Sequence, residues 1–416
     1  MRYNKQKWKK AGEDMVIGVI GGGASGMAAA LAAAENENVQ VVLFERQARL
    51  GRKLSATGNG RCNLTNLHAG AKGYHGDAPE FVGPALDGFD VTQTLGWFRS
   101  MGLFTVAEST GRVYPYSDQA NSVVDVLRFA LEKKNIRQEL GFEVTKLRCK
   151  NGGFSVESTE RTVYCDRVIV ACGGLAGTKL GGSMAGYQLL RSMGHRMTKL
   201  RPALVQLKCG WSGVTALKGV RANCHAAVIH DGAVHAQSTG ELQFTEYGLS
   251  GPVIFEISRD ACQGRGSWTC RLDFLPEVST QELAEELKRR RATALNAEEL
   301  LTGILHNRLG RVLTKNAGIS ANRGISSLTD GEITAVCEAV KAFEIALTEP
   351  LGMDSAQVTA GGIVTSEFDP QTMESRLMPG LYACGEVLDI DGDCGGYNLQ
   401  WAWSSGRLAG LSAGKE

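Results

Sequence analysis

Four short, mostly hydrophobic runs are separated by glycine-rich or polar stretches. These runs cover residues 16–20, 39–44, 167–171 and 380–384. A short apolar run bounded by turn residues is typical of a parallel strand that is buried on both faces. Between the first two runs, residues 27–34 are mostly alanine, which favours a short buried helix. The pattern predicts an α/β protein with one doubly wound parallel sheet, whose last strand comes from the C-terminal part of the chain.

The pattern changes between residues 201 and 275, where apolar and polar residues alternate in short runs. Residues 224–230 and 232–237 meet at Asp231 and Gly232, a dipeptide that favours a two-residue hairpin. We therefore expect antiparallel strands in this region.

A helical period follows the alternating region. Residues 279–291 begin with Ser279 and Glu282, which have the spacing of a capping box. Residues 296–305 and 330–346 also have apolar positions at helical spacing. The sequence predicts a group of helices after the antiparallel strands.

The turn between the first two apolar runs reads G-G-G-A-S-G. Gly21 permits a tight turn, Gly23 lets the backbone approach a pyrophosphate, and Gly26 allows a helix to pack closely on a strand. The second run ends at Glu45, whose carboxylate can accept a hydrogen bond from a ribose hydroxyl. The combination predicts a Rossmann βαβ unit that binds a dinucleotide at a helix N-terminus. Further contacts to the dinucleotide are expected from Ala24, Ser25 and Arg46.

A second interpretation of the same region is a signal peptide or membrane span. Residues 15–34 carry no charge, and they follow a basic stretch with Lys5, Lys7, Lys9 and Lys10. Glycines at the fingerprint spacing weaken a spanning helix, and an acid stands where the dinucleotide interpretation needs it. The dinucleotide interpretation is therefore favoured.

The four apolar runs and the two intervening regions predict a Rossmann-type domain that is split by an insertion. We expect its first part at residues 1–198 and its second part at 354–416. The insertion would consist of a β subdomain at 199–278 and a helical subdomain at 279–353.

Composition narrows the class of protein. The chain has 416 residues and a net charge of +1, so nothing in the charge balance favours nucleic acid or an anionic membrane as a partner. The eleven cysteines include no C-x-x-C pair, and histidines and cysteines form no zinc-binding spacing, so no metal site is expected. This use of cysteine predicts a cytoplasmic protein. Cys62 is expected to be a packed thiol rather than a reactive one.

Residues 51–66 are too rich in glycine and asparagine for a plain connection, and we interpret them as a cofactor clamp. Lys53 and Arg61 can balance negative charge, and the amides of Asn59 and Asn63 can donate and accept hydrogen bonds. Thr57, Gly60 and Cys62 are expected to contact the cofactor as well. An ordinary solvated loop is the alternative.

Two later segments bring glycine-rich turns to the same sheet edge. The third run is followed by Gly173, so that Ala171 and Gly173 bring backbone close to the cofactor. The fourth is followed by Gly385 and Glu386, whose carboxylate can bind a ribityl hydroxyl. A second turn, at Gly396, opens a helix whose N–H groups at Tyr397, Asn398 and Leu399 can face a developing anion, as at the pyrimidine edge of a reduced flavin.

These segments, together with residues 240–252 and 359–364, resemble the YhiN/BaiN-like FAD-binding oxidoreductases, also called the aminoacetone oxidase family. The stretches T-G-N-G-R-C-N and G-G-Y-N-L-Q-W-A carry the resemblance, which covers nearly the whole chain. It implies FAD in the split Rossmann domain and activities that range from reduction of steroid-like enones to oxidation of small aminoketones. Val144 and Gly362 are added to the expected cofactor contacts.

Four further residues are candidates for roles on the substrate side. Tyr114, Tyr116, Glu246 and Tyr247 are candidates for lining a substrate pocket or relaying a proton, although a tyrosine more often packs with its hydroxyl satisfied. Glu246 stands where the family resemblance implies histidine, so the proton-transfer range at this position differs.

The source of electrons stays open on the sequence alone. The insertion contains no second G-x-G-x-x-G, so no separate NAD(P)H domain is expected. Either NAD(P)H docks transiently and the enzyme reduces an activated C=C bond of a small molecule, or oxygen reoxidises the flavin and the enzyme is an oxidase of small amines. The reductase is favoured on resemblance. A flavin-containing RNA-modification protein and a nucleotide-binding protein without catalysis are less favoured alternatives, and the oligomeric state is left undefined.

Overall fold

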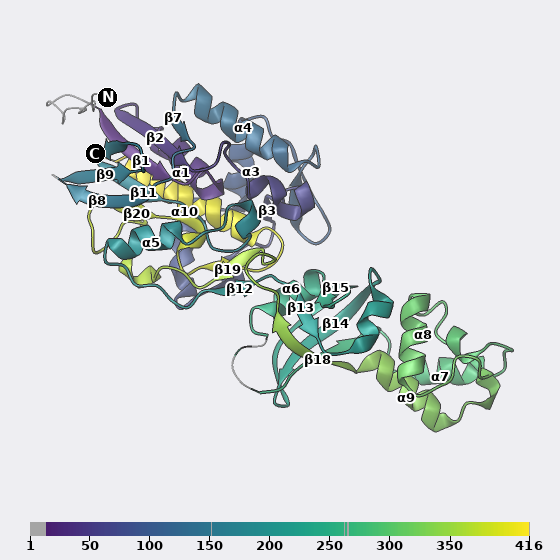
Figure 1. Cartoon of the computed structure of the whole chain (residues 1–416). Helices are drawn as coiled ribbons and strands as arrows, with labels where there is room; N and C mark the ends of the chain where they lie inside the picture. The colour runs from purple at the N-terminus through teal and green to yellow at the C-terminus, as the bar shows by residue number, and fades with distance from the viewer. Residues whose placement is uncertain (1–13, 151, 262, 264–265, 416) are drawn as a thin grey trace. The chain divides into compact units, whose positions relative to one another are not determined.

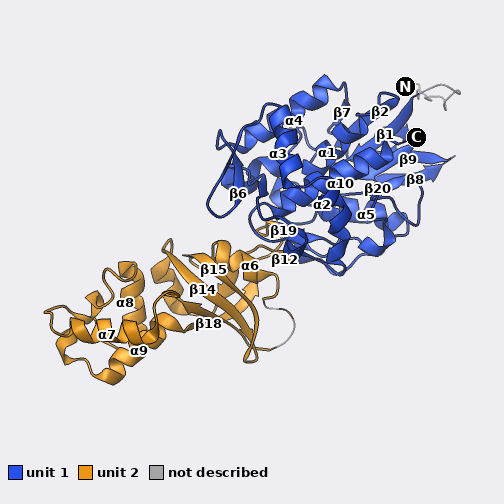
Figure 2. Cartoon of the chain, turned by 180° about the vertical axis from the view of Figure 1, so that it is seen from behind, with its two compact units in different colours: residues 1–201, 358–416 blue, residues 202–357 orange. Residues whose placement is uncertain are grey.

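The structure is a computed structural model that describes residues 14–150, 152–261, 263 and 266–415. The basic residues from Lys5 to Lys10 lie outside this part of the chain. Internal contacts divide the chain into two compact units (Figure 2). Unit 1 comprises residues 1–201 and 358–416, and unit 2 comprises residues 202–357.

Unit 1 is built on a five-stranded parallel sheet. Its order is β20 (Leu381–Ala383), β11 (Arg167–Val170), β1 (Met15–Ile20), β2 (Val39–Glu45) and β7 (Arg137–Leu140). The four predicted strands are therefore confirmed, including the one supplied by the C-terminal part. The fifth, β7, was missed because Arg137, Gln138 and Glu139 interrupt any apolar run.

Two helices with small residues pack against each other beside this sheet (Figure 1). They are α1 (Ala24–Ala33) and the C-terminal α10 (Tyr397–Ala413). Gly406 and Gly410 face the backbone of α1 so closely that an added Cβ would overlap the carbonyl oxygens of Ser25 and Ala29. The C-terminal helix is thus part of the same layer as the first helix of the chain.

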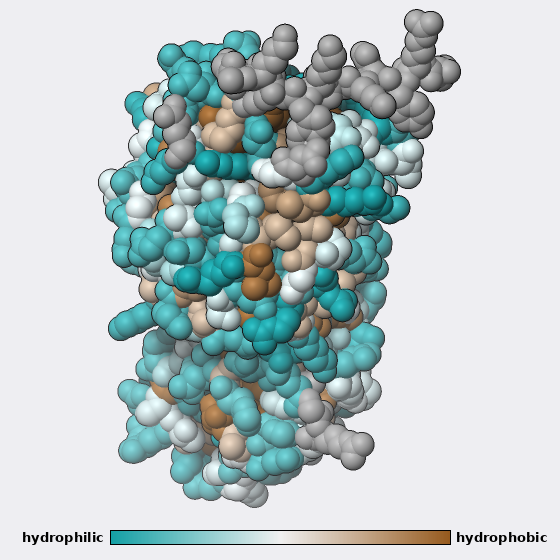
Figure 3. Space-filling model, turned by 90° about the vertical axis from the view of Figure 1, so that its left-hand side faces the viewer, coloured by the Kyte–Doolittle hydropathy of each residue, from teal (hydrophilic) through white to brown (hydrophobic). Residues whose placement is uncertain are grey.

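The uncharged stretch at residues 15–34 is a strand followed by the ten-residue helix α1, not a single span. In the part of the chain that the structure describes, no helix has both the length and the apolar character needed to cross a bilayer. The face drawn in Figure 3 is largely hydrophilic, with hydrophobic residues in small separate groups.

The remaining elements of unit 1 surround the sheet. The helices are α2 (Gly83–Gly88), α3 (Val91–Ser100), α4 (Ala120–Lys133) and α5 (Ala185–Ser192). One small sheet contains β8 (Lys146–Lys150), β9 (Gly153–Glu157) and β10 (Thr162–Cys165). Another contains β3 (Thr65–Asn66), β5 (Thr105–Ala107) and β6 (Arg112–Pro115). A last pair joins β4 (Tyr74–His75) to β21 (Asp391–Gly392).

Unit 2 combines a closed barrel with a helical part. The barrel strands are β13 (Leu207–Cys209), β16 (Gly248–Ser250), β15 (Ala233–Phe244), β14 (Arg221–His230), β17 (Trp268–Asp273) and β18 (Phe343–Pro350). The hairpin at Asp231 and Gly232 has φ of 47° and 88°, as the dipeptide predicts. The helices are α6 (Pro252–Ser258), α7 (Thr280–Arg290), α8 (Asn307–Asn316) and α9 (Asp330–Lys341). The predicted capping box of Ser279 and Glu282 is present at the start of α7.

Two predicted helices of unit 2 are wrong in extent. Residues 330–346 do not form one helix, because α9 ends at Lys341 and Phe343 begins β18, where buried and exposed residues alternate and the strand closes the barrel. Residues 296–305 form only a short 3-10 turn at Ala297–Glu299. Gly303 has a φ of 80°, which does not continue a right-handed helix.

Candidate cofactor and active site

The glycine turn after β1 combines two tightly packed positions with one open position. Gly21 has a φ of 111°, and an added Cβ would overlap the carbonyl oxygen of Ala171. A Cβ on Gly26 would overlap the carbonyl oxygen of Gly21. At Gly23, by contrast, the φ of −83° is ordinary and no atom lies within 4 Å of the Cβ position. The protein itself does not explain a glycine at position 23, whereas a ligand placed against its backbone does.

The N-terminus of α1 lies directly at this open position. Gly23 is the N-cap, and Ala24 and Ser25 occupy the first turn, whose N–H groups have no intrahelical acceptor. These groups and the helix dipole favour an anion. The arrangement fits the pyrophosphate of a dinucleotide.

Glu45 at the end of β2 is held beside the glycine turn. One carboxylate oxygen accepts from the N–H of Gly22 at 2.8 Å, and the other accepts from the N–H of Gln47 at 2.7 Å. Each oxygen keeps a further lone pair that can accept from a ribose hydroxyl. Arg46 instead donates to the carbonyl oxygen of Gly181 at 2.7 Å and lies 4.0 Å from Glu143, so the protein already supplies its partners.

The predicted clamp is an irregular turn that contains several left-handed residues. Asn59 has a φ of 56°, and Gly60, at 86°, has open space around its Cβ position. Thr57 fixes the turn, because its hydroxyl donates to the carbonyl oxygen of Leu54 and its own carbonyl oxygen accepts from the N–H of Cys62. Cys62 is fully buried, and burial raises the pKa of its thiol to about 12. This thiol is a packed, protonated group, as the sequence analysis favoured.

Asn63 provides a second sign of a ligand. Its Oδ1 is buried and has no hydrogen-bond partner among the described residues. Leaving a buried acceptor without a donor costs about 1–3 kcal/mol. A polar ligand that donates here would remove that cost.

Residues from three distant segments meet at Glu386. One carboxylate oxygen lies 2.9 Å from the ammonium nitrogen of Lys53, and the other accepts from the N–H of Thr359 at 2.9 Å. The neighbouring Gly385 has a φ of 74° and stands against the Ser25 side chain of α1. The structure thus brings Lys53 and Glu386 together. Thr359 was missed, because its contact with Glu386 joins residues 27 positions apart across a turn.

The start of α10 is set by two glycines in left-handed conformations. Gly396, with a φ of 109°, lies so close to the backbone of Thr65 that an added Cβ would overlap it. Asn398 holds the preceding loop, since it accepts from the N–H of Gly392 at 2.9 Å and donates to its carbonyl oxygen at 2.7 Å. Tyr397 donates from its hydroxyl to the carbonyl oxygen of His68 at 3.2 Å.

The side chains at 397 and 398 therefore hold the protein together, and Leu399 packs partly buried against the core of unit 1. The part of this segment that remains for a ligand is the row of backbone N–H groups at the helix N-terminus.

The other four predicted contacts differ in their surroundings. Val144 is buried, and two residues before it Phe142 donates its N–H to the carbonyl oxygen of Glu45. Ala171 donates its N–H to the carbonyl oxygen of Ile20, and Gly173 has a φ of 69° with open space at its Cβ position. Gly362 instead packs against the backbone of Leu388. A glycine at 362 is explained by the protein alone.

Two of the predicted catalytic residues lie on β6 or just after it. Tyr114 is buried, and the guanidinium of Arg61 stacks on its ring at 3.9 Å from the centroid. Burial raises the pKa of the Tyr114 hydroxyl. Arg61 also pairs with Asp118 and with Glu108 at 3.0 Å. Tyr116 is 73% exposed and lies on the surface of unit 1.

The other two predicted catalytic residues belong to unit 2. Glu246 lies in the turn between β15 and β16 and pairs with Lys218, whose ammonium holds the pKa of this carboxyl below its ordinary value. Tyr247 accepts at its carbonyl oxygen from the N–H of Cys209. At both positions the structure shows local contacts within unit 2, and the catalytic role of these residues stays a prediction.

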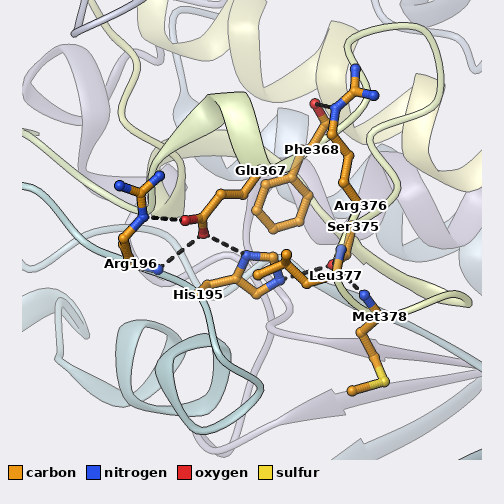
Figure 4. Close-up of polar contacts among 8 residues, drawn as sticks. All are labelled: His195, Arg196, Glu367, Phe368, Ser375, Arg376, Leu377 and Met378. Carbon is orange, nitrogen blue, oxygen red and sulfur yellow. Dashed lines mark hydrogen bonds and ion pairs between the residues drawn. The ribbon is translucent and has the colours of Figure 1, made fainter.

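A polar chain at His195 was not predicted from the sequence (Figure 4). Its Nδ1 lies 3.0 Å from the Glu367 carboxylate, and its Nε2 lies 2.9 Å from the Ser375 hydroxyl. The ring stacks on Phe368, and Arg196 donates to Glu367 from both its backbone and its side chain. Burial lowers the pKa of His195 below its ordinary value of 6.5, although Glu367 opposes this effect.

The order serine, histidine and carboxylate is that of a hydrolytic triad, but the surroundings are not. The Ser375 oxygen accepts from the N–H groups of Leu377 and Met378, at 3.1 and 2.9 Å, and the His195 side chain is fully buried. A nucleophile needs access to a substrate and a free lone pair. This network instead fixes the loop that leads into β20, and it lay beyond sequence reasoning because its members are up to 180 residues apart.

A second unpredicted pair joins β4 to the loop after β21. The Nε2 of His75 lies 2.7 Å from a carboxylate oxygen of Asp393, and both side chains are half-exposed. No local motif marks either residue, since they are 318 positions apart.

Taken together, unit 1 has an open glycine turn after the parallel strand β1, two helix N-termini and an orphaned buried amide oxygen. This fold and site define a dinucleotide-binding Rossmann protein, and the residues present fit FAD. The profile of the HI0933-like protein Rossmann domain matches residues 15–412. The chain belongs to this family.

Relatives of known activity align along nearly the whole chain. The 3-dehydro-bile acid delta(4,6)-reductase of Clostridium scindens is 41% identical over 403 residues, which cover 95% of this chain and 98% of that protein. The ribosomal RNA dihydrouridine synthase of Escherichia coli is 30% identical over 389 residues, covering 93% and 95%. The prediction of the YhiN/BaiN-like family and of a FAD-dependent oxidoreductase is confirmed.

Among solved structures, the 3-ketosteroid delta1-dehydrogenase of Sterolibacterium denitrificans aligns with 96% of this chain and 99% of its own. The sequence identity is 12% and the TM-score 0.49. A likeness at this level has no bearing on the substrate.

Proposed function

We propose that this protein is a FAD-dependent reductase that takes electrons from NAD(P)H and reduces a C=C bond conjugated to a carbonyl in a small, steroid-like molecule. The observation that carries the proposal is the 41% identity to a 3-dehydro-bile acid delta(4,6)-reductase over 95% of the chain. A fold alone does not define a function, so the proposal depends on this identity along nearly the whole chain together with the site described above.

Different residues of unit 1 would bind different parts of FAD. The backbone at Gly23 and the N-terminus of α1 would take the pyrophosphate, and Glu45 would accept from the adenosine ribose. Glu386, fixed by Lys53 and Thr359, would accept from the ribityl chain. The first N–H groups of α10 would face the pyrimidine edge, where they stabilise negative charge. When bound, FAD supplies a hydride-transferring N5, and the protein supplies position and electrostatics.

A second candidate is the reduction of uridine in RNA. It is favoured by the 30% identity to a ribosomal RNA dihydrouridine synthase over 93% of the chain. Both candidates saturate a C=C bond next to a carbonyl, so one site can serve either substrate. The net charge of +1 gives no electrostatic excess for a polyanion, which favours the small molecule.

Anaerobic stopped-flow spectroscopy tests the proposal in two half-reactions. NADH and NADPH are mixed separately with the purified yellow protein, and the reduced protein is then mixed with a 3-oxo-4,6-diene steroid or with a uridine-containing ribosomal RNA fragment. Bleaching by a nicotinamide followed by recovery of colour with the steroid supports the proposal. Recovery with RNA alone supports the second candidate. No bleaching by either nucleotide, together with peroxide release from amines in air, overturns both and identifies an amine oxidase.

A further inference from the structure

The pair formed by His75 and Asp393 is fixed by backbone on both sides. Strand β4 runs antiparallel to β21, with His75 opposite Asp391 and Tyr74 opposite Gly392. Asp393 follows β21 directly and donates its N–H to the carbonyl oxygen of Gly73 at 2.9 Å. The imidazole and the carboxylate, 2.7 Å apart, therefore meet without depending on a flexible loop.

The same backbone connects the pair to the start of α10. Asp393 stands three residues before the N-cap Gly396. The Tyr74 hydroxyl donates to the carbonyl oxygen of Tyr397 at 2.9 Å, and the Asn398 side chain donates to that of Gly392. The His75 pair thus belongs to the loop that opens α10, the helix whose N-terminus is assigned to the flavin.

Exposure distinguishes this pair from the other polar groups nearby. The side chains of His75 and Asp393 are 38% and 36% exposed. Tyr74 beside them is buried, and burial raises the pKa of its hydroxyl beyond any useful range. Asp389, two residues before β21, is also buried, and burial together with the nearby Asp77 raises the pKa of its carboxyl. The His75 pair, by contrast, is open to solvent on its exposed side.

Reducing a conjugated C=C bond needs a proton as well as a hydride. One carbon of the bond receives the hydride, and the π electrons of the bond move onto the other carbon, which must take up a proton. A carboxylate on one imidazole nitrogen orients the ring and stabilises its protonated form, so the ring can serve as an acid at neutral pH.

We infer that His75 is the general acid of the reaction and that Asp393 positions it. In this step the hydride comes from the cofactor after its reduction by NAD(P)H. The hydride forms a C–H bond at the β-carbon. The π bond breaks, and the proton on the His75 imidazole forms the second C–H bond at the carbon next to the carbonyl. His75 then regains a proton from water. This assignment rests on the proposed function, and it adds a residue pair that neither the sequence pattern nor the family resemblance pointed to.

The test separates the two half-reactions in His75→Gln and Asp393→Asn holoenzymes. His225→Gln is the matched control, because His225 lies on β14 of the barrel and contacts Thr239. We expect FAD content, the absorption spectrum, the rate of bleaching by NAD(P)H and the rate of reoxidation by oxygen to equal those of the wild type. Reoxidation by the 3-oxo-4,6-diene should slow by about 100-fold in His75→Gln, within the range for loss of a general acid. Asp393→Asn should show a smaller loss.

A readout that does not depend on turnover checks the coupling of the pair. In the holoenzyme labelled with ¹³C-histidine, one imidazole should titrate in the wild type, shift its midpoint downward in Asp393→Asn, and disappear in His75→Gln.

Three outcomes overturn the inference. Reoxidation by the enone at the wild-type rate in His75→Gln rejects the acid role. Loss of FAD or an equal slowing of all steps in both variants assigns the pair to holding β4 on β21. If the wild-type protein itself is never reoxidised by the enone, the proposed function fails, and the substrate-directed role of His75 fails with it. The wild-type half-reaction thus tells the two failures apart.

Discussion

Replacing Gly23 by alanine should separate the stability of the protein from its affinity for FAD. The backbone of Gly23 has an ordinary φ of −83°, and no atom lies within 4 Å of the added Cβ. Alanine at a helix N-cap costs about 0.5–1 kcal/mol relative to glycine. Alanine also lowers the conformational entropy of the unfolded chain, which stabilises the folded protein by about 0.4–1 kcal/mol. The free energy of unfolding of the apoprotein should therefore change by less than about 1 kcal/mol.

The effect on FAD should be much larger. If the pyrophosphate lies against the backbone of Gly23, the methyl group occupies that space and displaces charge-assisted hydrogen bonds worth about 2–3 kcal/mol. This loss corresponds to a Kd for FAD that is about 30- to 150-fold higher.

Calorimetric FAD titration of the stripped protein and thermal unfolding of the apoprotein measure the two quantities. Gly96→Ala is the matched control, because Gly96 lies inside α3 with an unhindered Cβ position and should gain stability without losing FAD. A Kd for Gly23→Ala within threefold of the wild type would refute the placement of the pyrophosphate. A large fall in the Tm of the apoprotein would refute the claim that this position is open.

Three further results are expected. Lys53→Met should weaken FAD binding by about tenfold, because the partly buried Glu386 loses a charge-assisted hydrogen bond; an unchanged fluorescence titration would contradict this. Burial lowers the pKa of His195 below 6.5, so the neutral imidazole stabilises the fold above that pH, and this stabilisation is lost as the pH falls. The Tm measured between pH 8 and pH 5 should therefore fall less in His195→Gln than in the wild type. Burial raises the pKa of Cys62 to about 12, so mass spectrometry after iodoacetamide treatment at pH 8 should find the exposed Cys149 alkylated and Cys62 intact.

The sequence predicted the central sheet because four of its five parallel strands are mostly hydrophobic runs, and such runs are visible locally. It missed β7, an edge strand with polar residues. It also missed β18, because the first residues of this strand, where buried and exposed positions alternate, were included in the predicted helix at 330–346. Both strands are defined by their partners rather than by their own composition, and partners are a property of the folded chain.

In the site, too, some features follow from the local sequence, and others depend on partners that are distant in the chain. The fingerprint glycines were predictable, because a tight turn, an open approach and a close helix contact each demand glycine at a fixed spacing. Gly362 and Asn398 were expected to face the cofactor, but their local contacts are with Leu388 and Gly392. The contacts of Glu386 with Lys53, and of His75 with Asp393, join residues more than 300 positions apart, and no local pattern encodes them.

The origin of β20 and α10 at the end of the chain has a consequence for biosynthesis. A nascent polypeptide that has emerged as far as unit 2 lacks the edge strand of the sheet, the carboxylate at 386 and the helix that packs on α1. Under the proposed placement of FAD, a polypeptide that ends before Leu381 should therefore fail to retain the coenzyme.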